Sequence, residues 1–311
     1  MEDQEEESDY DMQCTKPITL QIKYKSGRPS LLYPDGLTVP CGKCLACRIS
    51  KRREWSLRML HELDNHEDSC FLTLTYDDEH LPPAASLCKR DLQLFIKRLR
   101  KSLEPRKIRY FACGEYGEET NRPHYHAIIF GLSLKEEDKQ LVRAAWPFCD
   151  WNNYCINKNS FGLAEPDSIA YVAGYIDKKF SGDLANQEYE QKNREPVFRL
   201  LSLGIGKNYC DKYSQDLKNN MYVTIKGVKH SLPRYYINRL GIDTSQITKQ
   251  AELTDCELTE HYTGIFVSSI DLYKAGLPKE NEMLIEGVKA AKNQYDMTLK
   301  AKSKILRSKK I

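Results

Sequence analysis

Hydrophobic residues follow two alternating periods between residues 69 and 180. The segment SCFLTLTY (69–76) is rich in aromatic, leucine and threonine residues and is followed by DDEHLPP, a pattern typical of a β-strand that then stops. In 86–103, apolar residues recur at helical spacing and the other face carries lysines and arginines. These apolar residues are Leu92, Phe95, Ile96 and Leu99. A strand is therefore predicted over 69–76 and a helix over 86–103.

The alternation continues toward residue 180. KIRYFACGEY (107–116) and PHYHAIIFG (123–131) are predicted to form two strands joined by a short turn. A helix over 133–146, a weak strand over 150–157 and a helix over 166–180 follow; the last begins with Pro-Asp and ends in lysines. The order β-α-β-β-α-β, with a further helix, is the split βαβ signature. It predicts an α+β protein with a ferredoxin-like antiparallel sheet and helices on one face.

The polar stretch SGDLANQEYEQKNREP (181–196) has no hydrophobic period, so a domain boundary is predicted there. This divides the chain into an acidic arm over 1–35, a folded domain over 36–182 and a C-terminal region over 183–311. The C-terminal region is expected to be mixed at first, then mostly helical, and to end in a basic tail.

The composition is that of a globular protein, with 311 residues, 41% hydrophobic and 29% charged. No apolar run approaches the roughly 20 residues that span a membrane, and the acidic start MEDQEEESDYD lacks the apolar core of a signal peptide. No membrane association and a cytoplasmic location are expected. The eleven cysteines are therefore expected to be reduced, and any tight cluster of them is a candidate metal site.

Charge is strongly segregated along the chain although the net charge is only +3. Six basic residues and one acidic residue lie in 43–58, nine basic and two acidic in 89–109, and six basic in the last twelve. Such blocks indicate a polyanion, most simply nucleic acid; the alternative is that each is a solvated helix face. Beside Trp55, four residues are expected to contact DNA phosphates: Lys51, Arg52, Arg53 and Arg58.

The segment PHYHAIIFG places two of the seven histidines one residue apart. On a strand His124 and His126 would share a face, about 6.6 Å apart along the chain, and could bind one cation. Glu115 ends the preceding strand and is the expected third ligand, with Glu118 and Glu119 as rivals. Two imidazoles and a carboxylate suit Mg²⁺ or Mn²⁺ and could accept Zn²⁺. The alternative is a pair of partly exposed sheet histidines.

Tyr171 and Tyr175 lie four residues apart on the helix predicted over 166–180, so they share a face. Lys178 lies on the same side, and Lys179 is its neighbouring alternative. Tyrosines at this spacing are most often core residues. Beside a divalent cation they gain a chemical use, because a phenol with a pKa of about 10 can attack a phosphate that the metal polarises.

Cys41, Cys44 and Cys47 form a C-x-x-C-x-x-C segment. Closely spaced thiolates can share a structural Zn²⁺, but a closed tetrahedral site needs a fourth ligand. The candidates, among which the sequence does not choose, are Cys14, Cys70 and His61. The alternative is a set of reduced thiols in a turn before a basic helix.

Three segments, in order, resemble the three motifs of the HUH superfamily of rolling-circle replication endonucleases: FLTLT, RPHYHAIIF and YVAGYIDKK. In the third, Val172, Tyr175, Ile176 and Lys178 match the apolar-x-x-Tyr-apolar-x-Lys form. CGKCLACR and GEYGEETNRPHYH resemble the replication initiators of the gokushovirus branch of the microviruses. The resemblance covers roughly residues 40–180.

The resemblance implies a metal-dependent endonuclease that nicks one DNA strand at a viral origin, on single-stranded or replicative-form DNA. Tyrosine becomes linked to the 5′-phosphate, a 3′-OH primes the host polymerase, and the second tyrosine acts when the displaced strand is rejoined. It makes His124, His126 and Glu115 metal ligands and Tyr171 and Tyr175 nucleophiles, with Tyr175 preferred if one suffices. Lys178 would be an auxiliary cation. A nucleotide-binding P-loop is absent from the sequence, so a host helicase would unwind the DNA.

Three further functions compete with this one. A non-catalytic, zinc-stabilised DNA-binding protein would explain the basic blocks and the thiols but not the histidine and tyrosine pairs. A metal-dependent hydrolase of small substrates usually needs further His and Asp ligands. Within the same superfamily, a transposase usually has one tyrosine, and a relaxase has its motifs in another order.

Overall fold

The computed structural model describes most of the chain between residues 37 and 243. The described residues are 14, 16–21, 37–117, 119–175, 185–225, 227–243, 256 and 260. The acidic run at the N-terminus, Lys178 with its neighbour Lys179, Glu118 and the basic tail lie outside them. The chain divides into two compact units, one of residues 51–223 and 232–236, the other of 1–50, 224–231 and 237–311.

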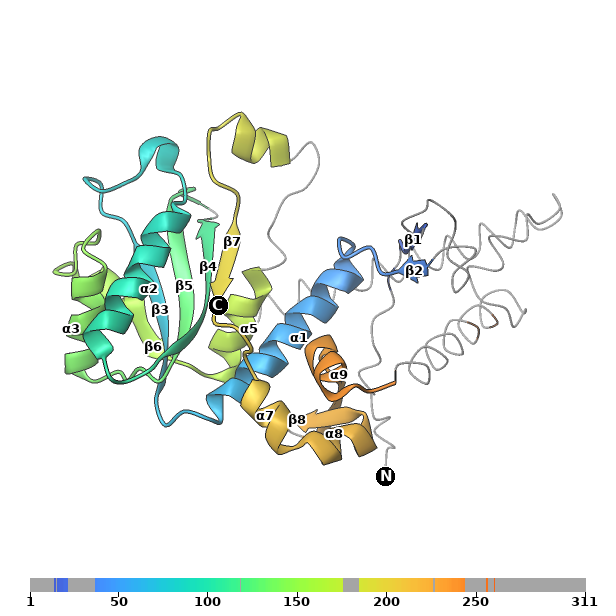
Figure 1. The fold of residues 1–311 in the computed structure, drawn as a ribbon. Coiled ribbons are helices and arrows are strands. Elements are labelled where there is room, and N and C mark those ends of the chain that lie inside the picture. The colour runs from blue at the N-terminus through green and yellow to red at the C-terminus, as the bar shows by residue number, and fades with distance from the viewer. Residues whose placement is uncertain are drawn as a thin grey trace, which may run out of the picture. The chain divides into compact units, whose positions relative to one another are not determined.

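The larger unit contains a five-stranded sheet in the order β6-β3-β5-β4-β7, in which every neighbouring pair is antiparallel (Figure 1). Its strands are β3 (Ser69–Thr75), β4 (Arg109–Tyr116), β5 (Pro123–Phe130), β6 (Phe161–Leu163) and β7 (Phe198–Leu201). The predicted α+β class is confirmed. The order of β6, β3, β5 and β4 is compatible with the ferredoxin-like arrangement, which stays a prediction in its detail.

One face of the sheet is covered by α2 (Lys89–Leu103) and α3 (Glu136–Ala145), the two helices of the predicted split βαβ unit (Figure 1). The helical period of α2 buries Leu92, Phe95, Ile96 and Leu99. They pack against alternate residues of the central strands, such as Leu72 in β3 and Ala127 in β5. We call this side of the sheet the α2/α3 face.

The opposite side is covered by α1 (Leu45–Leu63) and α5 (Pro166–Gly174), and we call it the α1/α5 face. Met59 of α1 and Val172 of α5 pack there against Phe111 and Ile128 of the sheet. The prediction of helices on one face is therefore correct for α2 and α3 only. The sheet is apolar on both sides, because strand residues of both parities are hydrophobic, and it needs helices on both.

The prediction of a weak strand over 150–157 is wrong. The chain turns there and enters a short helix, α4 (Tyr154–Ser160), before the edge strand β6. Asn153 explains the difference, since its carbonyl accepts the amide of Asn157 at 2.9 Å and its side chain accepts that of Ile156 at 3.4 Å. Asparagine before a helix stabilises this kind of start.

The remaining elements are short. They are β1 (Ile18–Leu20), β2 (Leu37–Val39), the single-turn helices η1 (Pro83–Ala85) and η3 (Asn186–Glu190), α7 (Lys207–Lys212), α8 (Ser214–Asn220), β8 (Tyr222–Ile225), β9 (Val228–Ser231) and α9 (Arg234–Leu240). In the described part, the C-terminal region is thus mixed, and β7 from this region joins the large sheet. The predicted boundary near residue 182 stays a prediction. None of the described helices is long and apolar enough to cross a membrane.

Candidate active site on the α1/α5 face

The pairing of β4 with β5 places the predicted metal ligands next to one another. Glu115 lies directly opposite His124, and Cys113 lies opposite His126. Successive side chains of a strand point to opposite faces, so both histidines share the α1/α5 face while Tyr125 between them packs into the α2/α3 core. The predicted facing of the histidines is therefore confirmed.

The three side chains converge on one point. Their ligand atoms all lie within 4.8 Å of one another. The Nε2 atom of His126 is 3.0 Å from Oε1 of Glu115, and that of His124 is 3.9 Å from the same oxygen. Glu115 is 3% exposed and His126 5%, whereas His124 is partly exposed. A buried carboxylate among imidazole nitrogens is a donor set that fits a divalent cation. Glu119, a rival third ligand, is exposed in the turn and outside this group.

Thr73 of β3 completes the surroundings of His126. Its Oγ1 lies 3.1 Å from Nδ1 of that imidazole, because Thr73 and His126 are partners in the β3–β5 pairing. A hydrogen bond at Nδ1 leaves Nε2, the atom that faces Glu115, as the one available for a cation. The segment FLTLT is recognisable as a motif in the sequence, but the role of this hydroxyl is not, because it depends on strand register.

Gly117 allows His124 to sit close to the end of β4. A Cβ atom at this position would lie 2.8 Å from Cε1 of the His124 ring, a distance that would force the imidazole to move. The glycine is visible in the sequence as a turn residue. Its contact with a candidate ligand is visible only in the structure.

Helix α5 brings both tyrosines to the histidines. It begins with Pro166 after a capping box between Glu165 and Ser168 and ends at Gly174, which places Tyr175 directly after the last helical residue. The Tyr175 ring lies flat against that of His126, with centroids 4.9 Å apart. Tyr171 meets the same imidazole edge-on at 5.3 Å, and the two phenol rings are 4.8 Å apart.

The two phenols differ in exposure. Tyr175 is 6% exposed and Tyr171 43%. Burial raises the pKa of Tyr175 far above its usual value, and the charge of Glu115 and the neighbouring Tyr171 phenol add to this rise. Tyr175 therefore stays protonated at neutral pH unless a cation offsets the negative charge beside it.

The predicted DNA-contacting residues of α1 do not behave alike. Lys51 is exposed, and Arg52 and Arg53 are partly exposed. The guanidinium of Arg52 lies against Gly174, 3.5 Å from the place where a Cβ would stand, and so next to the tyrosine helix. Neither sequence spacing nor charge indicates this contact, because it joins two distant helices.

Arg58 is a correction to the prediction. It is 6% exposed, its guanidinium carbon lies 4.2 Å from the ring centroids of both Trp55 and Tyr235, and its Nε donates to the carbonyl of Ile205 at 3.0 Å. A side chain held between two rings has no surface left for a DNA phosphate. Arg58 is part of the core beneath α1.

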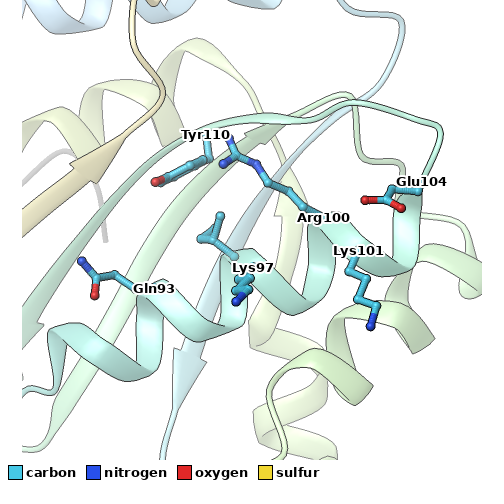
Figure 2. Close-up of a pocket in the computed structure, with 7 residues that line it drawn as sticks. Gln93, Lys97, Arg100, Lys101, Glu104 and Tyr110 are labelled. Atoms are coloured by element: carbon cyan, nitrogen blue, oxygen red, sulfur yellow. The ribbon is translucent and has the colours of Figure 1, made fainter.

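The basic block at 89–109 lies away from the candidate site. Figure 2 shows Lys97, Arg100 and Lys101 along α2, beside a hollow of about 480 Å³ that Tyr110 also lines. Arg100 lies over the Tyr110 ring, 5.1 Å from its centroid. Because α2 covers the α2/α3 face, this block fits the alternative of a solvated helix face better than a contact at the histidines.

The cysteine segment also forms a cluster. Cys41, Cys44 and Cys47 are joined by Cys14, and the four sulfur atoms lie within 4.8 Å of one another. The remaining two candidates for fourth ligand are placed elsewhere: Cys70 is buried in the core of the sheet, and His61 is stacked on Tyr209.

Comparison with known proteins links residues 69–180 to a family model of viral replication-associated proteins, described by its member ORF2. The replication-associated protein VP4 of Bdellovibrio phage phiMH2K is 34% identical, over 72% of this chain and 76% of its own length. ORF2 of Spiroplasma virus 4 is 32% identical, over 65% and 68%. ORF4 of Chlamydia phage 1 is 27% identical, over 64% and 52%. Both are also named replication-associated proteins. No solved structure matches the chain.

Proposed function

The chain belongs to the viral replication-associated proteins of microvirus-like phages, and from this premise we propose that it is the endonuclease that starts their rolling-circle replication. In this proposal it cuts one strand at the viral origin, on single-stranded or replicative-form DNA, in a metal-dependent reaction. The observation that carries the proposal is the contact of both tyrosine rings with His126, inside the group of Glu115, His124 and His126.

These three residues would hold one Mg²⁺ or Mn²⁺. The fit is supported by the donor set, one carboxylate and two imidazoles with ligand atoms within 4.8 Å of each other. A bound divalent ion would polarise a phosphate oxygen and offset the charge that develops in the transition state. The residues of the chain supply the remaining requirements, which are a nucleophile, its position and a way to hold the strand.

In the proposed cleavage a phenol oxygen of the protein forms a bond to phosphorus while the bond from phosphorus to the 3′ oxygen breaks. The phenol proton ends on the released oxygen, so the products are a 3′-OH and a tyrosine linked to the 5′-phosphate. Stored in this phosphotyrosine ester, the bond can be re-formed with another 3′-OH, which rejoins the displaced strand as a circle. A host polymerase would extend the 3′-OH, and a host helicase would separate the strands.

We assign the first cleavage to Tyr175 and the second to Tyr171. Tyr175 has the shorter ring distance to His126, 4.9 Å against 5.3 Å, and lies flat on it. Since Tyr175 is buried, a bound phosphate has to displace its ring from His126 before the phenol can attack. Tyr171 is open to solvent and remains available after the first phenol is esterified.

Lys51, Arg52 and Arg53 are the proposed phosphate contacts, with Arg52 nearest to the tyrosine helix. Lys178, which lies outside the described residues, keeps its proposed role as an auxiliary cation. Neutralising the three α1 residues together should weaken DNA binding and reduce its dependence on salt concentration, since each phosphate contact releases counterions. Unchanged, salt-sensitive binding by the triple variant would contradict this assignment.

The decisive experiment looks for the covalent product. Single-stranded oligonucleotides that tile the phage genome are labelled at the 3′ end, because the downstream fragment is the one that stays on the protein. With Mg²⁺ or Mn²⁺, the wild-type chain should give a labelled band of protein mass on a denaturing gel. The Tyr171→Phe/Tyr175→Phe variant should give none, and Tyr213→Phe, which changes an exposed tyrosine outside the site, should behave as wild type.

A full adduct yield from the double variant would refute the tyrosine assignment. Origin binding without cleavage by the wild-type chain would instead support the non-catalytic DNA-binding function.

A further inference from the structure

The cysteine cluster, defined by Cys14, Cys41, Cys44 and Cys47, has the dimensions of a metal site. The Sγ atoms of Cys44 and Cys14 are 3.8 Å apart, and all four sulfurs lie within 4.8 Å of one another. Four sulfurs at about 2.3 Å from a central Zn²⁺, in tetrahedral directions, lie about 3.8 Å apart. The cluster thus matches the edge length of a tetrathiolate site.

Backbone amides point at the sulfurs as well. The amides of Lys43 and Cys44 lie 3.4 and 3.2 Å from the sulfur of Cys41. The amide of Cys41 lies 3.2 Å from the sulfur of Cys14, and that of Cys47 lies 3.5 Å from the sulfur of Cys44. A neutral thiol is a weak acceptor, whereas a thiolate makes stronger, charge-assisted hydrogen bonds. Four amides aimed at three sulfurs are therefore what a thiolate cluster requires.

The turn that presents these amides depends on Gly42. Its φ angle is +70°, in the left-handed region that glycine adopts without a steric cost. This conformation lets the chain curl back so that two successive amides face the sulfur of Cys41. The segment CGKC thus supplies two ligands and the hydrogen bonds to one of them.

A disulfide or an iron–sulfur cluster fits these four cysteines less well than a single metal ion. A disulfide needs sulfurs about 2.05 Å apart, and no disulfide joins the cysteines of the described residues. An iron–sulfur cluster binds its cysteines on separate iron atoms around a larger core, so their sulfurs would lie farther apart than in this group.

We propose that the cysteine cluster binds one structural Zn²⁺, with Cys14 as the fourth ligand. Binding converts four thiols into thiolates and releases up to four protons, so metal affinity rises with pH. Cys14 precedes β1, Cys41 follows β2, and Cys44 and Cys47 lie at the start of α1. The ion would therefore join the two ends of the β1–β2 ladder to the first turn of the helix that carries Lys51 and Arg52, a role independent of catalysis.

The test measures metal in the intact chain. The His124→Ala/His126→Ala protein is used as background, so that zinc at the candidate active site does not add to the count. After expression with zinc and removal of loose metal by gel filtration, elemental analysis should find about one zinc and no iron per chain. Replacement by Co²⁺ should give the intense visible bands of tetrahedral cobalt with thiolate-to-metal charge transfer.

Cys14→Ser and Cys44→Ser, each in this background, should lower the zinc content to below a tenth per chain. The matched control is Cys88→Ser, since Cys88 is also partly exposed but outside the cluster; it should keep the zinc. Absence of zinc from the background protein, iron in its place, or full zinc retention by Cys14→Ser would overturn the proposal. The first two measurements need no cysteine variant and remain decisive if a variant fails to fold.

Discussion

The two faces of the central sheet are built from alternating residues of the same strands, and they differ in what those residues do. On the α2/α3 face, Leu72, Tyr125 and Ala127 are packed and closed to solvent. On the α1/α5 face, one residue away along the chain, lie Thr73, His124 and His126. The contrast shows that a strand can supply a core and a candidate site at once, because its period of two keeps them apart.

Polar groups are also treated differently on the two faces. The buried hydroxyl of Tyr125 is satisfied within the α2/α3 core by the hydroxyl of Tyr76 at 2.9 Å and the amide of Cys88 at 2.7 Å. On the α1/α5 face, Glu115 is equally buried, and its nearest partners are imidazoles whose charge is not fixed. A buried carboxylate in such surroundings is costly unless a cation or proton compensates it. The first face is complete as it stands, and the second has room for a cation.

The largest expected effect comes from removing the ligands. His124→Ala/His126→Ala should reduce nicking by at least about 10³-fold at any Mg²⁺ or Mn²⁺ concentration, which corresponds to about 4 kcal/mol of transition-state stabilisation. The measurement is the adduct assay across a metal titration. Tyr125→Phe, which changes the residue between the two histidines, should keep nicking activity and lose only stability. Equal loss of nicking in both variants would remove the distinction between the faces.

The second effect concerns the α2/α3 core. Phe95→Ala, at a fully buried position of α2, should lower the free energy of unfolding by about 3–5 kcal/mol. Urea denaturation measures this loss. Nicking per folded molecule, measured well below the unfolding transition, should stay close to that of wild type. A large loss of specific activity at full folding would show that the core and the site are coupled.

The third effect is a dependence of stability on pH on the α1/α5 side. Burial lowers the pKa of His61 to about 4 from 6.5, while the unfolded chain keeps the ordinary value. Between these values the unfolded state binds more protons, so stability is full above pH 6.5 and falls as the pH decreases toward 4. The loss should approach about 3 kcal/mol at most, at about 1.36 kcal/mol per pKa unit.

Urea denaturation at several pH values between about 7 and 4.5 checks this prediction. His61→Gln removes the titrating ring and should flatten the part of the pH dependence that His61 causes, so the difference between the two proteins is the quantity to follow. Parallel pH profiles for both would show that another group is responsible.

The smallest effect sharpens the comparison at a single hydroxyl. Thr73→Val removes the hydrogen bond to Nδ1 of His126 and should weaken Mn²⁺ binding by about 10–100-fold, as the loss of a partner to a ligating histidine does. Calorimetric titration measures the affinity. Thr75→Val is the matched control, because Thr75 lies on the same strand and bonds Cys149 instead. Its affinity should be unchanged, and an equal loss in both variants would contradict the role of Thr73.

Much of the candidate site could be predicted because it depends on local periods. The spacing of His124 and His126 on a strand, and of Tyr171 and Tyr175 on a helix, is written into adjacent residues, and the comparisons with phage replication proteins agree with the resemblance that these motifs carry. What failed was prediction from composition. Arg58 belongs to a basic block but is buried, and residues 150–157 contain aromatic residues yet lead into a helix.

The sequence by itself determined which residues could do chemistry and which elements carry them, because hydrophobic period, turn residues and motif spacing are local properties. Only the tertiary structure decided which of these residues meet. It joined Cys14 to the three clustered cysteines, brought Thr73 to His126 through strand register, and set Arg52 against Gly174. These contacts join residues far apart in the chain, and packing, which depends on the whole fold, is what brings them together.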